Sequence, residues 1–244
     1  EDHYTTARDL AIISCAAFQN ETFREIIKTP YYIVPETNIT NETRWLNNHH
    51  KMVLPDSSEY YEGCLGGKTG YTVKAGNTLV TYAERNGMRL VCVVLADINE
   101  HYNDTKALFD YGFQNFQKTA PQAETFSATK DDTLGVKLLE QGILTPVFQN
   151  SSLIVPKEQK GTLSFQTALE EDNTLLVTYR YGETVLGSSS LPATDEILAA
   201  AKELGIRKEA AKQGNMTFQK ESEEKETDIT PDSSKETGSS SPKG

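Results

Sequence analysis

The sequence feature that most constrains the fold is a pair of β-forming segments joined by a tight-turn signal. The segments AGNTLVTYA (75–83) and MRLVCVVLA (88–96) are rich in Val, Leu, Thr and Tyr, residues that favour strands. Between them, Asn86-Gly87 is typical of a two-residue hairpin turn, whose central residues need positive φ angles. The sequence therefore predicts an antiparallel β-hairpin in this part of the chain.

Helices are expected on both sides of this hairpin. Residues 5–18 and 21–28 read as two helices, the second ended by Pro30, and a loop-rich stretch with several asparagines follows. Residues 103–118 predict an amphipathic helix after the hairpin. The apolar residues expected on the helix faces are Leu10, Ile13, Ala17 and Phe18 in the first and Leu108, Phe109, Phe113 and Phe116 in the last. Helices around antiparallel strands predict an α/β fold over about residues 1–120.

The pattern changes at Pro121, where short β segments begin. We expect a second, all-β domain at 121–195, built as a small sandwich. Residues 196–213 favour a helix by propensity. Residues 214–244 hold almost no large apolar side chain and are expected to be a disordered polar tail. The segments expected as strands are LGVKLL (134–139), SSLIVP (151–156), GTLSFQTA (161–168), TLLVTYRYG (174–182) and ETVLGSSSL (183–191).

The composition narrows the classes of function. The net charge is -11 and the pI is near 4.9, and such a surface repels both phosphate backbones and anionic lipid heads, so nucleic-acid binding is not expected. The chain has three cysteines and no C-x-x-C pair, which argues against a disulfide framework or a structural zinc site. No signal peptide opens the chain, and it contains no run of about 18 apolar residues that could span a membrane.

The segment to which we assign chemistry is Lys68-Thr69-Gly70. The three residues alone are a weak signal, but two glycines precede them and the hairpin follows. Gly70 leaves a strand edge without a side chain, so a substrate backbone can approach closely. Thr69 offers a hydroxyl and Lys68 a cation, and both suit the terminal carboxylate of a peptide. The alternative reading of this segment is an ordinary strand end with a solvated lysine.

The surrounding sequence extends this signal. The run GGKTGYTVKAGNTLV (66–80) resembles the third motif of low-molecular-mass penicillin-binding proteins, the serine-type D-alanyl-D-alanine carboxypeptidases. Further similar segments are YTTARDLAIIS (4–14), RWLNNHHKMV (44–53), NGMRLVCVVL (86–95) and DYGF (110–113). The resemblance covers about residues 1–120 strongly and the β segments up to about residue 195 more weakly. It implies part of a β-lactamase/transpeptidase-like domain, followed by a β-sandwich domain.

The resemblance also implies a reaction and roles for residues. Members of this family remove the terminal D-alanine of peptidoglycan stem peptides through an acyl-enzyme, with a serine activated by the lysine of an S-x-x-K motif and a second S-x-N motif that relays protons. By position, Lys68 supports the second-motif serine and the peptide carboxylate, Thr69 binds that carboxylate, and the Tyr71 N–H is an oxyanion-hole donor. The partners implied are stem peptides ending in D-Ala-D-Ala, with β-lactams as inhibitors. No metal or organic cofactor is implied, and the expected location is outside the cytoplasmic membrane.

The sequence departs from the family pattern in two respects. No S-x-x-K or S-x-N motif precedes Lys68, and the three S-x-x-K strings that begin at Ser127, Ser222 and Ser240 are expected to be chance matches. We therefore expect this chain to begin just after the second motif, to lack the nucleophile and general base, and to be inactive alone. Relatives often carry an arginine near the place of His101, which we expect to be a loop histidine with a possible substrate role. Any membrane anchor would have to lie beyond Gly244.

Trp45, His49 and His50 precede the motif, and the sequence also allows two other functions. His49 and His50 lie near the expected cleft, but we do not expect them to contact substrate. Trp45 is expected in the core. One rival function is a serine β-lactamase, which shares the K-T-G strand, although the trailing β domain argues against it. Another is a non-catalytic cell-wall-binding module, in which residues 122–195 and the tail are the working parts.

Overall fold

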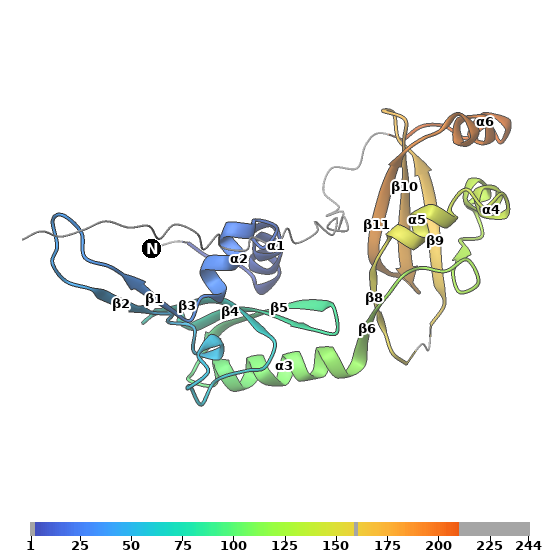
Figure 1. Ribbon diagram of the computed structural model, residues 1–244. Coiled ribbons are helices and arrows are strands. Elements are labelled where there is room, and N and C mark those ends of the chain that lie inside the picture. Colours follow the sequence, from blue (N-terminus) through green and yellow to red (C-terminus); the bar gives the residue numbers. More distant parts are fainter. Residues whose placement is uncertain (1–2, 159–160, 210–244) are drawn as a thin grey trace, which may run out of the picture.

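The computed structural model describes residues 3–158 and 161–209, arranged as two units along the chain (Figure 1). The expected tail at 214–244 and the end of the expected last helix lie outside the described residues. The first unit contains α1 (Ala7–Ala17), α2 (Glu21–Lys28), β1 (Tyr31–Val34), β2 (Arg44–Asn47), the 3-10 helix η1 (Lys51–Val53), β3 (Cys64–Thr72), β4 (Gly76–Arg85), β5 (Met88–Asp97) and α3 (His101–Asn115).

The predicted hairpin is confirmed as the strand pair β4 and β5. With β3 these strands form an antiparallel sheet in the order β3-β4-β5, so β4 is central and β3 lies at an edge. Asn86 and Gly87 have φ angles of 52° and 71°, the left-handed conformation that the Asn-Gly signal predicts. The α/β class with an antiparallel sheet is therefore confirmed.

Helices cover both faces of this sheet: α1 and α2 lie on one face and α3 on the other (Figure 1). On the face covered by α1 and α2, Tyr82 of β4 packs against α1. Its ring stacks on Phe18 with centroids 4.4 Å apart, and its hydroxyl donates to the Ser14 carbonyl oxygen at 2.8 Å. Its neighbours along the strand point to the opposite face, as alternation requires. There Leu79 and Ala83 pack in one cluster with Met52, Tyr61, Cys92 and Phe109.

Some expectations for the helices and the loop-rich stretch are wrong. In α1 the buried residue is Ser14, Phe18 follows it, and Ile13 is 61% exposed instead of packed. The stretch after α2 forms the antiparallel hairpin β1–β2. Trp45, expected in the core, lies on this hairpin and is 71% exposed. The reason is visible in Figure 1, where β1 and β2 extend away from the main sheet.

The second unit mixes sheets and helices. Its elements are β6 (Phe116–Thr119), β7 (Ser127–Ala128), α4 (Thr133–Glu140), α5 (Thr145–Asn150), β8 (Leu153–Pro156), β9 (Leu163–Leu169), β10 (Thr174–Tyr181), β11 (Thr184–Pro192) and α6 (Asp195–Glu203). One sheet has the order β11-β10-β9-β7 and the other pairs β6 with β8. Phe148, Phe165 and Tyr179 lie at the centre of its core. Strand β6 starts before the expected boundary at residue 121 and already pairs with β8.

Two predictions for this unit are wrong, and the observed helix ends have local causes. Residues 134–139, expected as a strand, lie in helix α4, because Asp132 caps the helix and Leu134 and Leu138 are buried one turn apart. The expected helix at 196–213 ends at Glu203. Gly205 has a φ angle of 67° just beyond the helix, the left-handed conformation that commonly ends helices.

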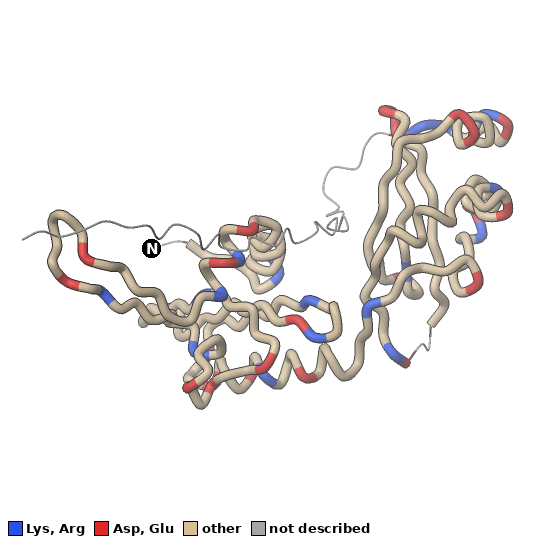
Figure 2. The backbone as a smooth tube through the Cα atoms, in the orientation of Figure 1, with Lys and Arg blue, Asp and Glu red and all other residues tan. Residues whose placement is uncertain are grey.

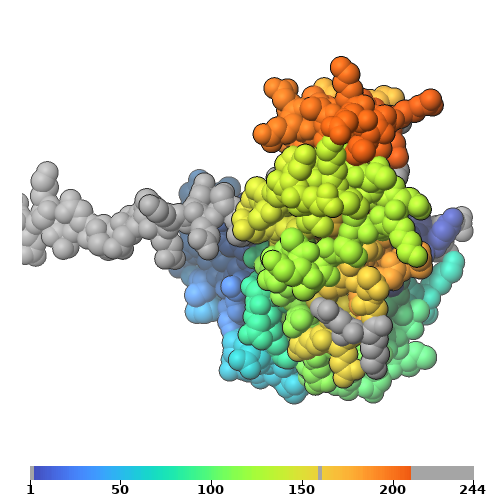
Figure 3. All heavy atoms as spheres, turned by 90° about the vertical axis from the view of Figure 1, so that its right-hand side faces the viewer, coloured from blue at the N-terminus to red at the C-terminus, as the bar shows by residue number. Residues whose placement is uncertain are grey.

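Along the backbone trace of Figure 2, the positions of Lys and Arg are interspersed with those of Asp and Glu. Figure 3 shows the second unit in front, with α6 lying above α4 on the side turned away from the first unit. No helix within residues 3–158 and 161–209 is long and apolar enough to cross a membrane.

We predict that Asp132→Ala destabilises the second unit. The buried carboxylate accepts from the Gly135 N–H at 2.8 Å, the Thr167 hydroxyl at 2.7 Å and the Thr167 N–H at 2.6 Å, so it joins α4 to β9. Loss of a cap together with unpaired buried donors is expected to lower the free energy of unfolding by about 2–4 kcal/mol. Urea denaturation followed by circular dichroism measures this loss. Asp131→Ala, at the exposed neighbouring position, is the control. Equal effects of the two substitutions would contradict the account.

Candidate functional site

Strand β3, which carries Lys68-Thr69-Gly70, lies at an edge of the sheet. Its inner edge pairs with β4, and no strand of the described residues pairs with its outer edge. Lys68 is exposed, Tyr71 is 68% exposed, and Thr69 and Gly70 are partly exposed. The segment is therefore a surface strand with an open row of backbone groups and is not packed inside a core.

The pairing register fixes where the side chains of β3 point. Lys68 lies opposite Val80, so it shares the face of Tyr82, which is covered by α1 and α2. Thr69 lies opposite Leu79 and shares the face covered by α3. The cation and the hydroxyl thus project from opposite sides of one strand, and a ligand lying along the edge can reach both. The Lys68 ammonium donates to the Thr69 carbonyl oxygen at 2.5 Å.

The two glycines before Lys68 allow neighbouring backbones to approach closely. Gly66 has a φ angle of 105°, and a Cβ there would lie 2.2 Å from the Ile27 carbonyl oxygen at the end of α2. A Cβ on Gly67 would lie 1.9 Å from the Val80 carbonyl oxygen of β4. No larger residue fits either position without moving backbone. The glycine pair therefore sets how close β3 lies to α2 and to β4.

His50 lies beneath β3 at Gly67. Its side chain is buried, and its Nε2 lies 2.9 Å from the Thr81 hydroxyl of β4. Burial of the ring, with smaller effects from the charges of Lys68 and His101, lowers the pKa of His50 from 6.5 to about 4. Hydrogen bonds with backbone groups act in the opposite direction but do not offset burial. The ring is therefore neutral at physiological pH. The exposed His49 has no comparable environment.

His101 begins helix α3 instead of lying in a loop, so that expectation is corrected. Its side chain is 16% exposed, and its Nδ1 lies 3.5 Å from Asp97 Oδ1, at the end of β5. Asp97 pairs with Asn77 of β4, which in turn pairs with Tyr71 of β3. Two strand spacings, about 10 Å, therefore separate the backbone at Asp97 from that of Tyr71. The structure brings His101 to the face of Thr69 but not to the outer edge of β3.

Two other features are not part of this site. Burial raises the pKa of the Cys64 thiol to about 11, so this cysteine is not an activated nucleophile.

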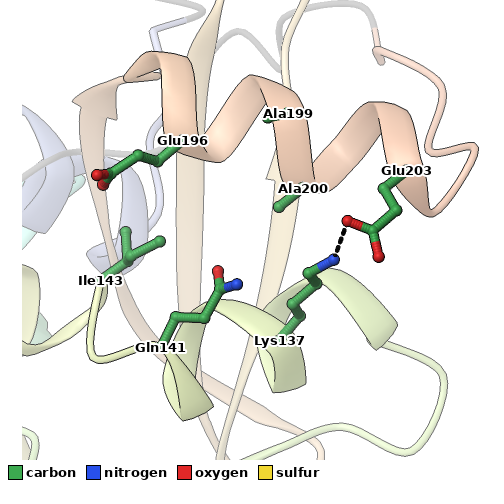
Figure 4. Close-up of a pocket in the computed structure, with 7 residues that line it drawn as sticks. All are labelled: Lys137, Gln141, Ile143, Glu196, Ala199, Ala200 and Glu203. Carbon is green, nitrogen blue, oxygen red and sulfur yellow. Dashed lines mark ion pairs between the residues drawn. The ribbon is translucent and has the colours of Figure 1, made fainter.

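A shallow hollow of about 360 Å³ lies in the second unit between α4 and α6, where Lys137 pairs with Glu203 (Figure 4). It contains none of the residues expected to bind substrate. Within the described ranges, His, Cys, Asp and Glu side chains form no group that could hold a metal ion.

Sequence reasoning did not identify the contribution of Asn48 and His50. The Asn48 side-chain amide donates to the carbonyl oxygens of Ile27 and Thr29, each at 3.0 Å, and its Oδ1 accepts from the His50 N–H at 2.9 Å. Both residues stand in a polar run, RWLNNHHKMV, whose composition gives no sign of burial. Their positions depend on packing between segments about 20 to 30 residues apart, which only the fold reveals.

Comparison with known proteins bears on the first unit. The sequence profile of the D-alanyl-D-alanine carboxypeptidase family matches residues 1–99. The D-alanyl-D-alanine carboxypeptidase DacB2 of Mycobacterium tuberculosis is 33% identical over 114 residues, which is 45% of this chain and 36% of that protein. The D-alanyl-D-alanine carboxypeptidase DacF of Bacillus subtilis is 24% identical over 225 residues, which is 90% of this chain and 54% of that protein.

Solved structures also match slightly less than half of the chain. A crystal structure of D-alanyl-D-alanine carboxypeptidase from Mycobacterium tuberculosis has 33% identity over 45% of this chain and 40% of that chain, with a TM-score of 0.39. A mutant of the Streptomyces K15 DD-transpeptidase has 31% identity over 47% of this chain and 44% of that chain, with a TM-score of 0.40. This chain thus spans between 36% and 54% of the length of the two curated relatives named above.

The expected resemblance is confirmed. The first part of the chain is similar to low-molecular-mass penicillin-binding proteins. Within that class, residues 1–99 match the D-alanyl-D-alanine carboxypeptidase family.

We predict that Gly67→Ala disturbs β3 more than Gly70→Ala does. The new Cβ at position 67 meets backbone oxygen, which cannot move without shifting a strand, and overpacking of this kind costs about 1–3 kcal/mol of the free energy of unfolding. At position 70 the Cβ meets only the Thr78 hydroxyl at 2.4 Å, which can rotate away. Chemical denaturation of both variants tests this order. If Gly70→Ala is as destabilised as Gly67→Ala, the close approach of Gly67 to the Val80 carbonyl oxygen does not determine the position of β3.

Proposed function

We propose that the first unit is the substrate-binding part of a serine-type D-Ala-D-Ala carboxypeptidase, and that β3 binds the C-terminal end of a peptidoglycan stem peptide. The observation that carries the proposal is that the G-G-K-T-G strand forms a sheet edge with no strand partner in the described part of the chain. The match of residues 1–99 to the carboxypeptidase family supports the substrate class. Because these relatives act on the cell wall, we also place the protein outside the cytoplasmic membrane.

The geometry suggests how a peptide is held. An extended peptide adds to β3 as a further strand, so that its backbone pairs with the open N–H and C=O groups. Lys68 and the hydroxyl of Thr69 flank the edge and offer a charge and a hydrogen bond to a terminal carboxylate. Gly70 keeps the edge clear of side-chain atoms, and the Tyr71 N–H is proposed to stabilise the developing oxyanion. His101 is at most a distant contributor through the face of Thr69.

The covalent step needs groups that this chain does not supply at β3. No S-x-x-K motif precedes Lys68, and the string that begins at Ser127 lies in strand β7 of the second unit. We propose that the nucleophilic serine, its activating lysine and the S-x-N motif are supplied from outside these 244 residues, and that the chain alone is inactive. β-Lactams would then act as inhibitors of the intact enzyme. We propose that the second unit, which begins at β6 and ends with helix α6, is a separate domain built mainly on β-sheets.

The binding part of this proposal predicts a local, stereospecific response. An acetylated peptide that ends in D-Ala-D-Ala is expected to shift the backbone amide NMR signals of residues 68–72, while the L-Ala-L-Ala analogue shifts them much less. Lys68→Ala and Thr69→Val are expected to weaken the response, because each removes one partner of the carboxylate. Lys130→Ala, an exposed lysine of the second unit, is the control. Shifts confined to the second unit, or equal responses to both peptides, would contradict the assignment.

The proposed absence of the nucleophile predicts that penicillin does not acylate this chain. Labelled penicillin is expected to leave the 244-residue chain unmodified, because the chain presents no activated serine at β3. Intact-protein mass spectrometry checks this, with a D-alanyl-D-alanine carboxypeptidase that contains all three motifs as the positive control. A covalent adduct on a serine of this chain would show that the nucleophile is present after all.

A further inference from the structure

The site contains a polar connection that the family motifs do not explain. The side chain of Asn48 accepts from the His50 N–H at 2.9 Å and donates to two carbonyl oxygens at the C-terminal end of α2, those of Ile27 and Thr29. The ring of His50 then reaches the Thr81 hydroxyl of the central strand at 2.9 Å. We call Asn48 and His50 the clamp, because together they join the end of α2 to β4 across the start of β3.

The glycine pair that precedes Lys68 lies against a hydrogen-bond partner of Asn48 on one side and against the ring of His50 on the other. The Ile27 carbonyl oxygen, which Asn48 holds, is the atom that a Cβ on Gly66 would meet at 2.2 Å. His50 Nε2 is one of the atoms that a Cβ on Gly67 would meet, at 2.9 Å. The clamp therefore holds the two surfaces against which β3 lies immediately before the exposed lysine.

The simplest alternative is that His50 is only a satisfied core residue. An aliphatic side chain would fill the same space without the cost of burying a polar ring. The His50 ring instead reaches the buried hydroxyl of Thr81, while Asn48 donates to the end of α2 and accepts from the His50 N–H. These four hydrogen bonds connect the end of α2, residues 48–50 and β4, which lie around the start of β3, and this arrangement indicates a role in setting the position of β3.

We propose that Asn48 and His50 are positioning residues that fix the backbone of Lys68-Thr69-Gly70 relative to α2 and β4. Their value to catalysis rests on the proposed function of β3, but their effect on the position of β3 does not. They touch neither a substrate nor the reacting atoms, so their role is indirect, through the strand.

The surroundings of His50 make its protonation a useful probe. Lys68 of β3 and His101 of α3 are the charged groups that act on the ring, and Tyr102 of α3 meets it edge-on with centroids 6.2 Å apart. Lys51, next in sequence, lies over the ring of Tyr102. Burial holds the pKa of His50 near 4, below the value of 6.5 in an unfolded chain. Protonation therefore favours the unfolded chain, and the stability that His50 contributes is present above pH 6.5 and falls as the pH drops toward 4.

The test compares amide NMR signals of residues 66–70 in the full chain and four variants. His50→Leu and Thr81→Val remove the ring–hydroxyl bond and are expected to displace these signals, while signals of the second unit stay in place. His50→Gln keeps a side-chain amide in place of Nε2 and is expected to restore them. His49→Leu, at the exposed neighbour, is the matched control and should change little. Thr81→Val keeps the size of the side chain, so it gives an answer even if His50→Leu does not fold.

A pH titration of the amide signals adds a measurement that does not change if His50 only fills space in the core. In the unmodified chain, the amides of Lys68 and Thr69 are expected to follow His50 with a midpoint near pH 4, and His50→Gln should abolish that step. Signals at residues 66–70 that are unchanged in both His50→Leu and Thr81→Val would overturn the proposal. A His50 midpoint near 6.5, the value of an exposed ring, would overturn it as well. No peptide is involved, so these outcomes do not depend on whether β3 binds one.

Discussion

The contact between Gly67 and the Val80 carbonyl oxygen is the constraint on which the site depends. Because a Cβ would lie 1.9 Å from that oxygen, β3 can follow β4 at this distance only with glycine there. The same closeness places Gly66 against the end of α2 and brings the buried ring of His50 beneath the strand. From that fixed start, the strand continues outward as an edge on which Lys68 is exposed. The chemistry proposed for the edge therefore depends on packing at its beginning.

Much of the first unit could be predicted because its signals are local. The Asn86-Gly87 turn, the helix at 21–28 and the strand at Lys68-Thr69-Gly70 each follow from a short stretch of sequence. The misplaced features depend on distant partners. Trp45 was expected in the core from its residue type, but nothing in a sequence says whether another element covers a hairpin. The clamp was missed because an asparagine and a histidine in a polar run give no sign that α2 and β4 close around them.

In the second unit, by contrast, the segment wrongly predicted as a strand carries a local helix signal. Residues 134–139 have strand-like composition, yet Asp132 stands at the capping position and the buried leucines recur at the spacing of a helix. Once that helix forms, the same carboxylate binds Thr167 of β9, so one residue both starts α4 and docks it on the sheet. The alternation of the later strands, which carry most of the core, was readable because each is half-buried. The family match covers residues 1–99, so the function proposed for the peptide-binding edge is argued from the first unit.

Binding of a peptide to β3 requires that the outer edge of this strand is open to an added strand. Amide hydrogen exchange along residues 68–72 tests this directly, because the N–H groups of an edge strand point alternately toward its partner and toward solvent. We expect protection to alternate from residue to residue, with the N–H groups that face β4 slow and the outward ones nearly as fast as in an unstructured peptide. Protection of consecutive N–H groups along this segment would mean that the edge is already covered, and would contradict the proposed binding site.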